Sequence, residues 1–183
     1  MFFKRARATK AARDAVRPFI RAIEQVGGIP SGFWDDPYVV GFLTAYINQF
    51  AKLSTRGKIS DDDLGMVIID VFEVISGQSA EPIARRGLEL QNSRDADYAK
   101  GVDNALKVFS VCFGQKHYDN DPDVIKAREL SNQLGDFGLR SATGGPMSET
   151  ARVGGTLQNM LFYQIVFERL GEGTGGIRIL PNR

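Results

Sequence analysis

Residues 36–57, which read DPYVVGFLTAYINQFAKLSTRG, decide the fold class of this chain. Asp36 followed by Pro37 is typical of a helix start, because the carboxylate caps free backbone N–H groups and proline fits the first turn. Apolar residues then recur every three or four positions as far as Gly57, and polar residues keep to a narrow stripe. This pattern predicts a helix that is largely buried in the core. Its apolar positions are Val39, Phe42, Leu43, Tyr46, Phe50 and Leu53.

Residues 60–77, SDDDLGMVIIDVFEVISG, repeat this pattern. Ser60 followed by Asp63 resembles a capping box, and Gly77 is a typical helix end. Asp70 and Glu73 fall on the side opposite the apolar face. That face comprises Leu64, Val67, Ile68, Val71, Phe72 and Ile75.

The remaining segments also favour helices, so we predict an all-α fold, a compact single-domain bundle of about seven helices. The segment Met160 to Phe167 is almost continuously apolar and fits either a helix or a buried strand. We favour a helix, because residues 148–170 are long for a strand and no neighbouring strands are evident.

Three regions are expected along the chain. Residues 1–17 form a basic N-terminal helical arm, 18–170 the helical domain, and 171–183 a flexible glycine-rich C-terminal tail. The boundary after residue 17 rests on Pro18, which lacks a backbone N–H and disfavours helical geometry at Arg17, so we expect a break or kink there.

Composition excludes several classes of protein. The chain has 183 residues, is 43% hydrophobic and carries a formal net charge of +1, which is ordinary for one globular domain. Its single cysteine, Cys112, excludes an intrachain disulfide and a zinc site of several thiolates. No segment is apolar for long enough to span a bilayer or act as a secretory signal, so a cytoplasmic protein without cofactors is expected.

Two residue pairs are candidates for a catalytic or metal-binding site. Cys112 and His117 would form a thiolate–imidazole pair if the chain turned back after Gly114. Asp70 and Glu73 are one helical turn apart and would present paired carboxylates to a metal or a substrate. A packed cysteine and a solvated acidic face are the simpler interpretations, so we predict no catalytic residue.

Three motif matches are set aside. The alternating acids Asp119, Asp121 and Asp123 lack the glycine and glutamate of a calcium loop and are expected to cap a helix, so no metal ligands are predicted. Residues 171–176 match GxGxxG, but too few residues follow for a dinucleotide-binding unit. The glycine-rich segment 135–147 contains the DFG string without the other kinase motifs, and we interpret it as a surface loop.

Charge is distributed unevenly along the chain. Residues 1–21 contain seven basic residues against Asp14 alone, a net of +6, which leaves −5 for residues 22–183. A basic arm on an acidic body either binds an anionic partner or membrane surface, or folds back onto its own body. Nucleic acid is less favoured, because few aromatic residues are interleaved with the charges. The binding residues would be Lys4, Arg5, Arg7, Lys10, Arg13 and Arg17.

The sequence therefore favours a non-enzymatic helical interaction module. The apolar run near residue 160 suggests possible homo-oligomerisation through Phe162, Ile165 and Val166. The alternative is a small-molecule-binding or enzymatic bundle, in which one of the two residue pairs lines an internal polar pocket.

Overall fold

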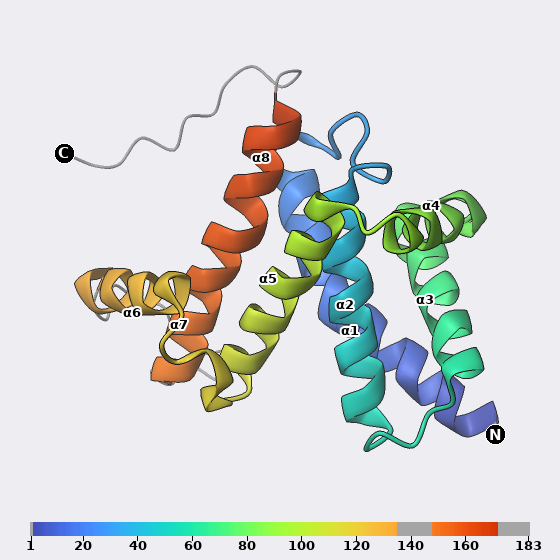
Figure 1. Cartoon of the computed structure of the whole chain (residues 1–183), viewed down its shortest axis with the longest axis horizontal. Helices are drawn as coiled ribbons and strands as arrows, with labels where there is room; N and C mark the ends of the chain where they lie inside the picture. The colour runs from blue at the N-terminus through green and yellow to red at the C-terminus, as the bar shows by residue number, and fades with distance from the viewer. Residues whose placement is uncertain (1, 135–147, 172–183) are drawn as a thin grey trace.

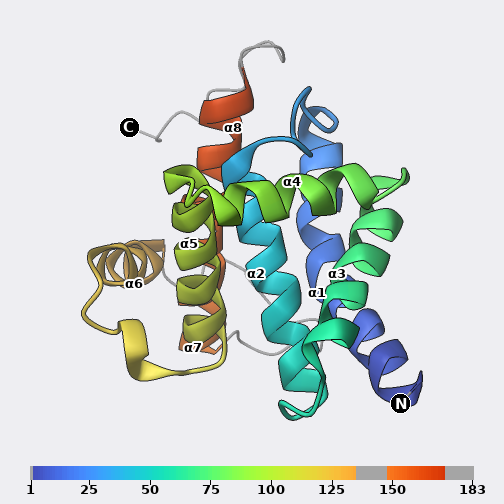
Figure 2. The ribbon, with the colours of Figure 1, turned by 45° about the vertical axis from the view of Figure 1, so that its right-hand side comes forward.

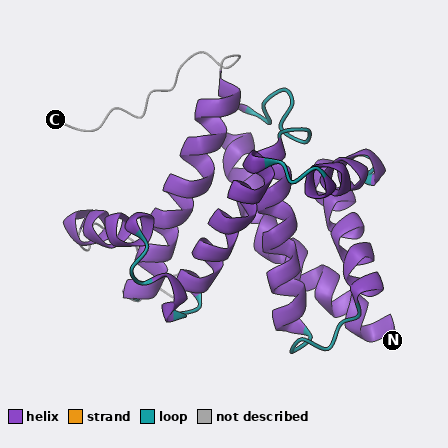
Figure 3. Cartoon of the chain, viewed as in Figure 1, coloured by secondary structure: helices purple, strands orange, loops and turns teal. Residues whose placement is uncertain are grey.

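The computed structural model describes residues 2–134 and 148–171, and all regular structure within them is helical (Figures 1 and 3). Elements α7, η2 and α8 follow one another without a gap, so the described chain forms seven helical rods and a short 3₁₀ turn. The predicted all-α single-domain bundle is confirmed. The elements are α1 (Phe2–Gly27), α2 (Pro37–Ser54), α3 (Asp61–Ser76), α4 (Glu81–Asn92), α5 (Ala96–Cys112), η1 (Lys116–Tyr118), α6 (Pro122–Leu134), α7 (Glu149–Gln158), the π-helical turn η2 (Asn159–Gln164) and α8 (Ile165–Leu170).

Helix α2 lies at the centre and packs most extensively against α5. Helix α1 covers another side of α2 and also contacts α3, while α7 packs against α5 and α6. Helix α4 crosses in front of α2 (Figure 2). Helix α1 therefore has an inner side toward α2 and α3 and an outer side that no described element covers.

Local signals at the helix ends act as the sequence predicts. The Asp36 carboxylate accepts a hydrogen bond from the Val39 N–H at 3.0 Å, and the Ser60 hydroxyl accepts one from the Asp63 N–H at 3.2 Å. Gly77 ends α3 with a positive φ of 68°, a conformation that glycine adopts without steric cost. These caps confirm the predicted start of α2 and both predicted ends of α3, whereas α2 ends at Ser54, three residues before the predicted end at Gly57.

Two glycines allow α2 and α5 to approach each other closely. A Cβ atom built on Gly101 would lie 2.2 Å from the Tyr38 carbonyl oxygen, and one on Gly41 would lie 2.3 Å from the Tyr98 carbonyl oxygen. Because both obstacles are backbone atoms, no side-chain rotation could relieve the contact. The crossing point of the two central helices therefore requires glycine on both sides.

Aromatic side chains fill the space around this crossing. The Phe42 ring lies 4.5 Å from Phe162, 5.8 Å from Tyr46 and 5.9 Å from Phe19, measured between ring centroids. These four rings come from α1, α2 and η2 and are buried. Aromatic burial of this kind contributes much of the stability of a small helical domain.

Helix α1 is continuous through Pro18, so of the predicted break or kink at Arg17 the break is wrong, while the helix does bend along its length (Figures 1 and 2). Proline removes one backbone hydrogen bond and costs roughly 3 kcal/mol in a helix interior. Val16, Phe19 and Ile20 on either side of Pro18 are buried, and their packing offsets this cost. The predicted arm of residues 1–17 is therefore the first part of a longer helix.

Residues Met160 to Phe167 are helical, as predicted, but the helix contains the π turn η2. The buried Tyr38 hydroxyl donates a hydrogen bond to the Leu161 carbonyl in this turn and accepts one from the Asn104 amide at 2.8 Å. Burial raises the pKa of Tyr38 to about 12, so the hydroxyl stays protonated as a donor. This network ties the π turn to α2 and α5.

Candidate functional site

The candidate site is the outer side of α1. Ala8, Ala12, Val16 and Ile23 of this helix are fully buried, and their spacing places them on one side of it. At 100° per residue, Arg7, Lys10, Arg17 and Arg21 fall on the opposite side, and all four are exposed. One helix thus carries a core face and a basic face.

Some of the predicted binding residues are neutralised within the chain. Arg5 forms a bidentate ion pair with Asp70 of α3, in which Nη2 lies 2.8 Å from Oδ1 and Nε lies 3.2 Å from Oδ2. The Thr9 hydroxyl lies 3.4 Å from the same carboxylate. Lys10 and Arg13 share Asp14, whose pKa is lowered, chiefly by the hydrogen bond from Lys10. The arm therefore folds back in part, at Arg5.

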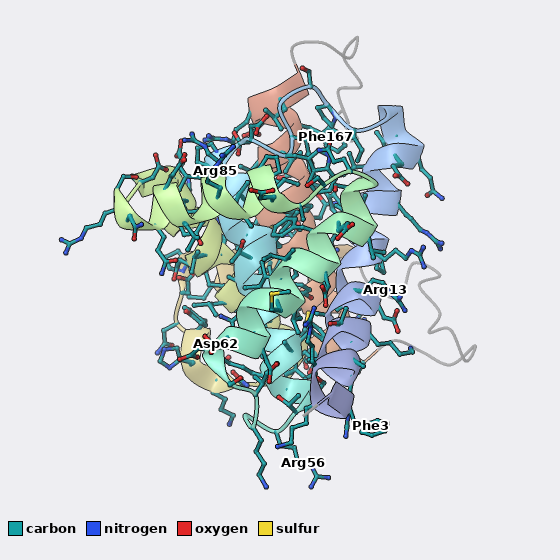
Figure 4. The ribbon with its side chains drawn as sticks, turned by 90° about the vertical axis from the view of Figure 1, so that its right-hand side faces the viewer. Phe3, Arg13, Arg56, Asp62, Arg85 and Phe167 are labelled. Carbon is teal, nitrogen blue, oxygen red and sulfur yellow. The ribbon has the colours of Figure 1, made fainter. Side chains whose placement is uncertain are left out.

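The other cations keep their charge available. Lys4, Arg7, Arg17 and Arg21 are exposed, and none of them pairs with a carboxylate within residues 2–134 and 148–171. Including Lys10 and Arg13, the outer side of α1 up to Arg21 carries six positive charges against Asp14, a net of +5. We call these six cations the basic face; Figure 4 shows Arg13 on the side of α1 that points away from the body.

Phe3 stands at the start of the same helix with 93% of its surface exposed. Among the large apolar side chains whose exposure the structure describes, the next is Leu88, at 61%. In Figure 4 Phe3 points away from the body at the N-terminal end of α1. An unpacked phenylalanine beside a row of cations is a feature that packing within the chain does not explain.

The two candidate catalytic pairs are not assembled. Asp70 is bound by Arg5, while Glu73 is exposed on another part of α3. Cys112 packs against Gly154, where an added Cβ would lie 2.6 Å from its sulfur, and burial raises the pKa of the Cys112 thiol. His117 is exposed and stacks edge-on against Tyr118. A raised thiol pKa is the opposite of what an activated nucleophile needs.

Two hollows outside the basic face contain neither pair. A pocket of about 170 Å³ between α2, α3 and α4 is lined mainly by apolar side chains, among them Ile68, Phe72 and Ile83. A more polar pocket of about 200 Å³ between η1, α6 and α7 is lined by residues that include Lys116 and Arg128.

A third hollow, of about 400 Å³, borders the basic face and is lined by Asp70 with Arg5, Thr9, Lys10 and Arg13, but Glu73 does not line it. None of these three hollows is lined by both members of a predicted pair.

The acidic group before α6 binds a lysine. Lys107 places its ammonium 3.0 to 3.3 Å from the carboxylates of Asp103, Asp121 and Asp123, and Asp121 also accepts a hydrogen bond from the Asp123 N–H at 2.9 Å. The predicted helix-capping role of Asp121 is confirmed. Burial alone would lower the pKa of Lys107, but the three carboxylates outweigh it and raise that pKa. Across the described residues, no three side chains of Asp, Glu, His or Cys are arranged to hold a metal ion.

Replacing Lys107 by methionine is expected to destabilise the protein at pH 7 by about 2 kcal/mol, because three carboxylates then face one another without a cation. Burial would raise the pKa of Asp121, but Lys107 and two backbone N–H groups lower it overall, so this group stabilises the fold above about pH 4 and the gain is lost as pH falls further. The raised pKa of Lys107 adds stability that is lost only well above neutral pH.

Thermal melts at pH 7 and pH 3 measure this difference. The melting temperature of Lys107→Met should fall further below that of the parent protein at pH 7 than at pH 3, and the exposed Lys126→Met is the control. Equal deficits at both pH values would contradict the ion cluster.

The predicted self-association residues lie mainly inside the chain. Phe162 and Val166 are fully buried, and Ile165 is half-buried. A partner would therefore meet neither Phe162 nor Val166 in the folded state. Homo-oligomerisation stays a prediction.

The glycine-rich segment 135–147 and the tail beyond Gly171 lie outside the described residues. In the described part, no helix combines the length and apolar character needed to cross a membrane. Comparison of the chain with models of protein families, with curated proteins and with solved structures finds no match.

Proposed function

We propose that this chain is a non-enzymatic binding protein that engages an anionic partner surface through the basic face of α1. The observation that carries the proposal is the division of one helix into a fully buried side and a side with a net charge of +5. The buried side anchors the helix to the domain, so the cations are held as a fixed array rather than on a loose chain.

The spacing of the cations supports collective action. Neighbours on the basic face are three or four residues apart, which is about 5 to 6 Å along a helix. The Debye length at physiological salt is about 8 Å, so adjacent charges act together on one anionic surface while distant ones are screened. Binding of this kind depends on charge and weakens as salt is added.

Replacing Arg7 and Arg17 together by glutamine tests the proposal. Each cation near an anionic bilayer contributes about 1 kcal/mol, so the double variant should lose roughly 30-fold in affinity for vesicles containing a third phosphatidylglycerol. It should also leave a heparin column at lower salt than the parent protein. Vesicle sedimentation and heparin chromatography measure both effects. Substitution is preferable to removal of residues 1–17, which would take the buried Ala8, Ala12 and Val16 out of the core.

The matched control is Arg85→Gln with Arg94→Gln. Both arginines are exposed, form no ion pair in the described chain and belong to α4 and the loop after it (Figure 4 labels Arg85). This double variant has the same net charge as the first and should bind nearly as tightly as the parent protein. If both double variants lose affinity equally, net charge alone explains the binding and the proposal is overturned. A parent protein that binds neither the vesicles nor heparin would also overturn it.

A further inference from the structure

We infer that the partner of the basic face is the surface of an anionic lipid bilayer, with Phe3 as the residue that inserts into it. This inference rests on the proposed function and adds the chemistry of the partner. Phe3 lies on the same side of α1 as the basic face. Residues 3, 7, 10, 14, 17 and 21 are separated by four, three, four, three and four positions, so they form one stripe along the exposed side of α1.

Along this stripe Phe3 is at one end and cations occupy most of the remainder, with Asp14 as the single acid. The stripe extends over about 27 Å, from the 1.5 Å rise of each residue in a helix. Phe3 and Arg7 are one turn apart, so the ring and the first guanidinium can touch the same surface together. Phe3 therefore belongs to the basic face geometrically.

A bilayer offers a surface that matches this order of side chains. Its anionic phosphates lie at the outside, and apolar acyl chains begin a few ångströms deeper, so aromatic residues settle at the boundary while cations remain among the phosphates. An exposed ring beside cations can contact both layers at once, with the ring among the acyl chains and the cations among the phosphates. A soluble polyanion offers the charge but no apolar layer in which a 93%-exposed phenylalanine could be buried.

The core face of α1 limits how deep the protein can go. Ala8, Ala12, Val16 and Ile23 are already buried against the domain, so the helix has no apolar side left to lay into the membrane. Among the side chains of α1 that the structure describes, insertion therefore falls to Phe3, and the remaining attraction is electrostatic. The expected result is reversible, salt-sensitive attachment with α1 lying along the lipid surface.

Phe3→Ala tests the role of the ring. Burying a phenylalanine side chain in an apolar layer is worth about tenfold or more in affinity, so this variant should bind phosphatidylglycerol-containing vesicles roughly tenfold more weakly. Its elution from heparin should not change, because no charge is removed. Leu88→Ala is the matched control, since Leu88 is also an exposed apolar residue but lies on α4. Phe3 makes little contact with the fold, so Phe3→Ala should keep the parent's circular dichroism spectrum and melting temperature.

A fluorescent variant reports insertion directly. Trp34 is the only tryptophan of the chain and is half-buried against Phe33 and Phe72. In Phe3→Trp the new indole should be quenched by vesicles whose acyl chains carry bromine, whereas the parent protein, with Trp34 alone, should not be quenched.

The outcomes separate the two proposals. If Arg7→Gln with Arg17→Gln weakens binding but Phe3→Ala does not, and the indole at position 3 is unquenched, the lipid inference is overturned and the proposed function stands. Phe3→Ala that weakens heparin and vesicle binding equally would point to a polyanion that contacts the ring, such as a nucleic acid, and would also overturn the lipid inference. If every α1 variant binds vesicles and heparin as tightly as the parent protein, both the proposed function and the lipid inference are overturned.

Discussion

Replacing Gly101 by alanine is expected to destabilise the protein by about 3 kcal/mol, near the upper end of what overpacking a core usually costs. The added Cβ would lie 2.2 Å from the Tyr38 carbonyl oxygen and 2.9 Å from the Phe42 backbone nitrogen. Because both atoms belong to the backbone of α2, the two central helices must move apart. Their separation would loosen the aromatic packing around Phe42 as well.

The direction of this change in stability tests the close crossing, because helix propensity alone predicts that alanine would stabilise the protein. Alanine in place of glycine in a helix interior gains about 1 kcal/mol when nothing obstructs the methyl group. Gly65 of α3 is such a position, since a Cβ built there meets no atom within 4 Å. Urea unfolding followed by circular dichroism should therefore show Gly65→Ala as stable as the parent or more so, and Gly101→Ala as much less stable. A Gly101→Ala variant as stable as the parent would refute the close crossing of α2 and α5.

This contrast explains which parts of the fold the sequence could predict. Caps such as Asp36 and Ser60 act on N–H groups three residues away, so their effect can be recognised from a short stretch of sequence. In the sequence, Gly101 and Gly41 only weaken otherwise helical segments. The backbone atoms that require them, at Tyr38 and Tyr98, lie about 60 residues away in the chain. The close crossing of the central helices was therefore beyond prediction from local patterns.

The candidate site shows the same limit. The sequence indicates how many cations the first helix has and that they alternate with alanines, which suffices to predict a basic segment. It does not indicate that Arg5 pairs with Asp70, a residue 65 positions away whose local sequence suggests only Glu73 as a neighbour. The place of Phe3 beside the first cations predicts apolar anchoring at an interface, but the sequence does not show that its ring is left exposed by the fold. Burial decides both points, and burial depends on the whole fold.

Pro18 and the apolar run near residue 160 illustrate how packing overrides local preference. The cost of a proline within α1 is offset by buried neighbours, so the helix continues. In the apolar run, the π turn shifts the angular positions of the residues that follow it, and Leu161, Phe162 and Val166 all reach the core. A continuous apolar stretch that fits either a core segment or a self-association surface is thus largely covered within the chain.

Replacing Phe162 by alanine is expected to have the largest effect of all, a loss of about 4 kcal/mol in the free energy of unfolding, which is the usual cost of deleting a buried phenylalanine ring. The Phe162 ring is fully buried, with centroid distances of 4.5 Å to Phe42, 5.2 Å to Phe19 and 5.5 Å to Tyr163. Removing it leaves a cavity where α1, α2 and η2 meet, which the surrounding rings can fill only in part. Urea unfolding measures the loss.

Gln164→Ala, an exposed change two residues along the same helix, is the control and should alter stability by no more than about 0.5 kcal/mol. Light scattering after size exclusion adds a readout that distinguishes a core residue from an interface residue. If Phe162 belongs to the core, Phe162→Ala lowers stability while the folded protein keeps the mass of the parent, whether that mass is a monomer or an oligomer. A parent dimer that becomes a monomer on this substitution, with its melting temperature nearly unchanged, would instead place Phe162 between two copies of the chain. Because the ring is enclosed by residues of its own chain, we expect the loss of stability at constant mass.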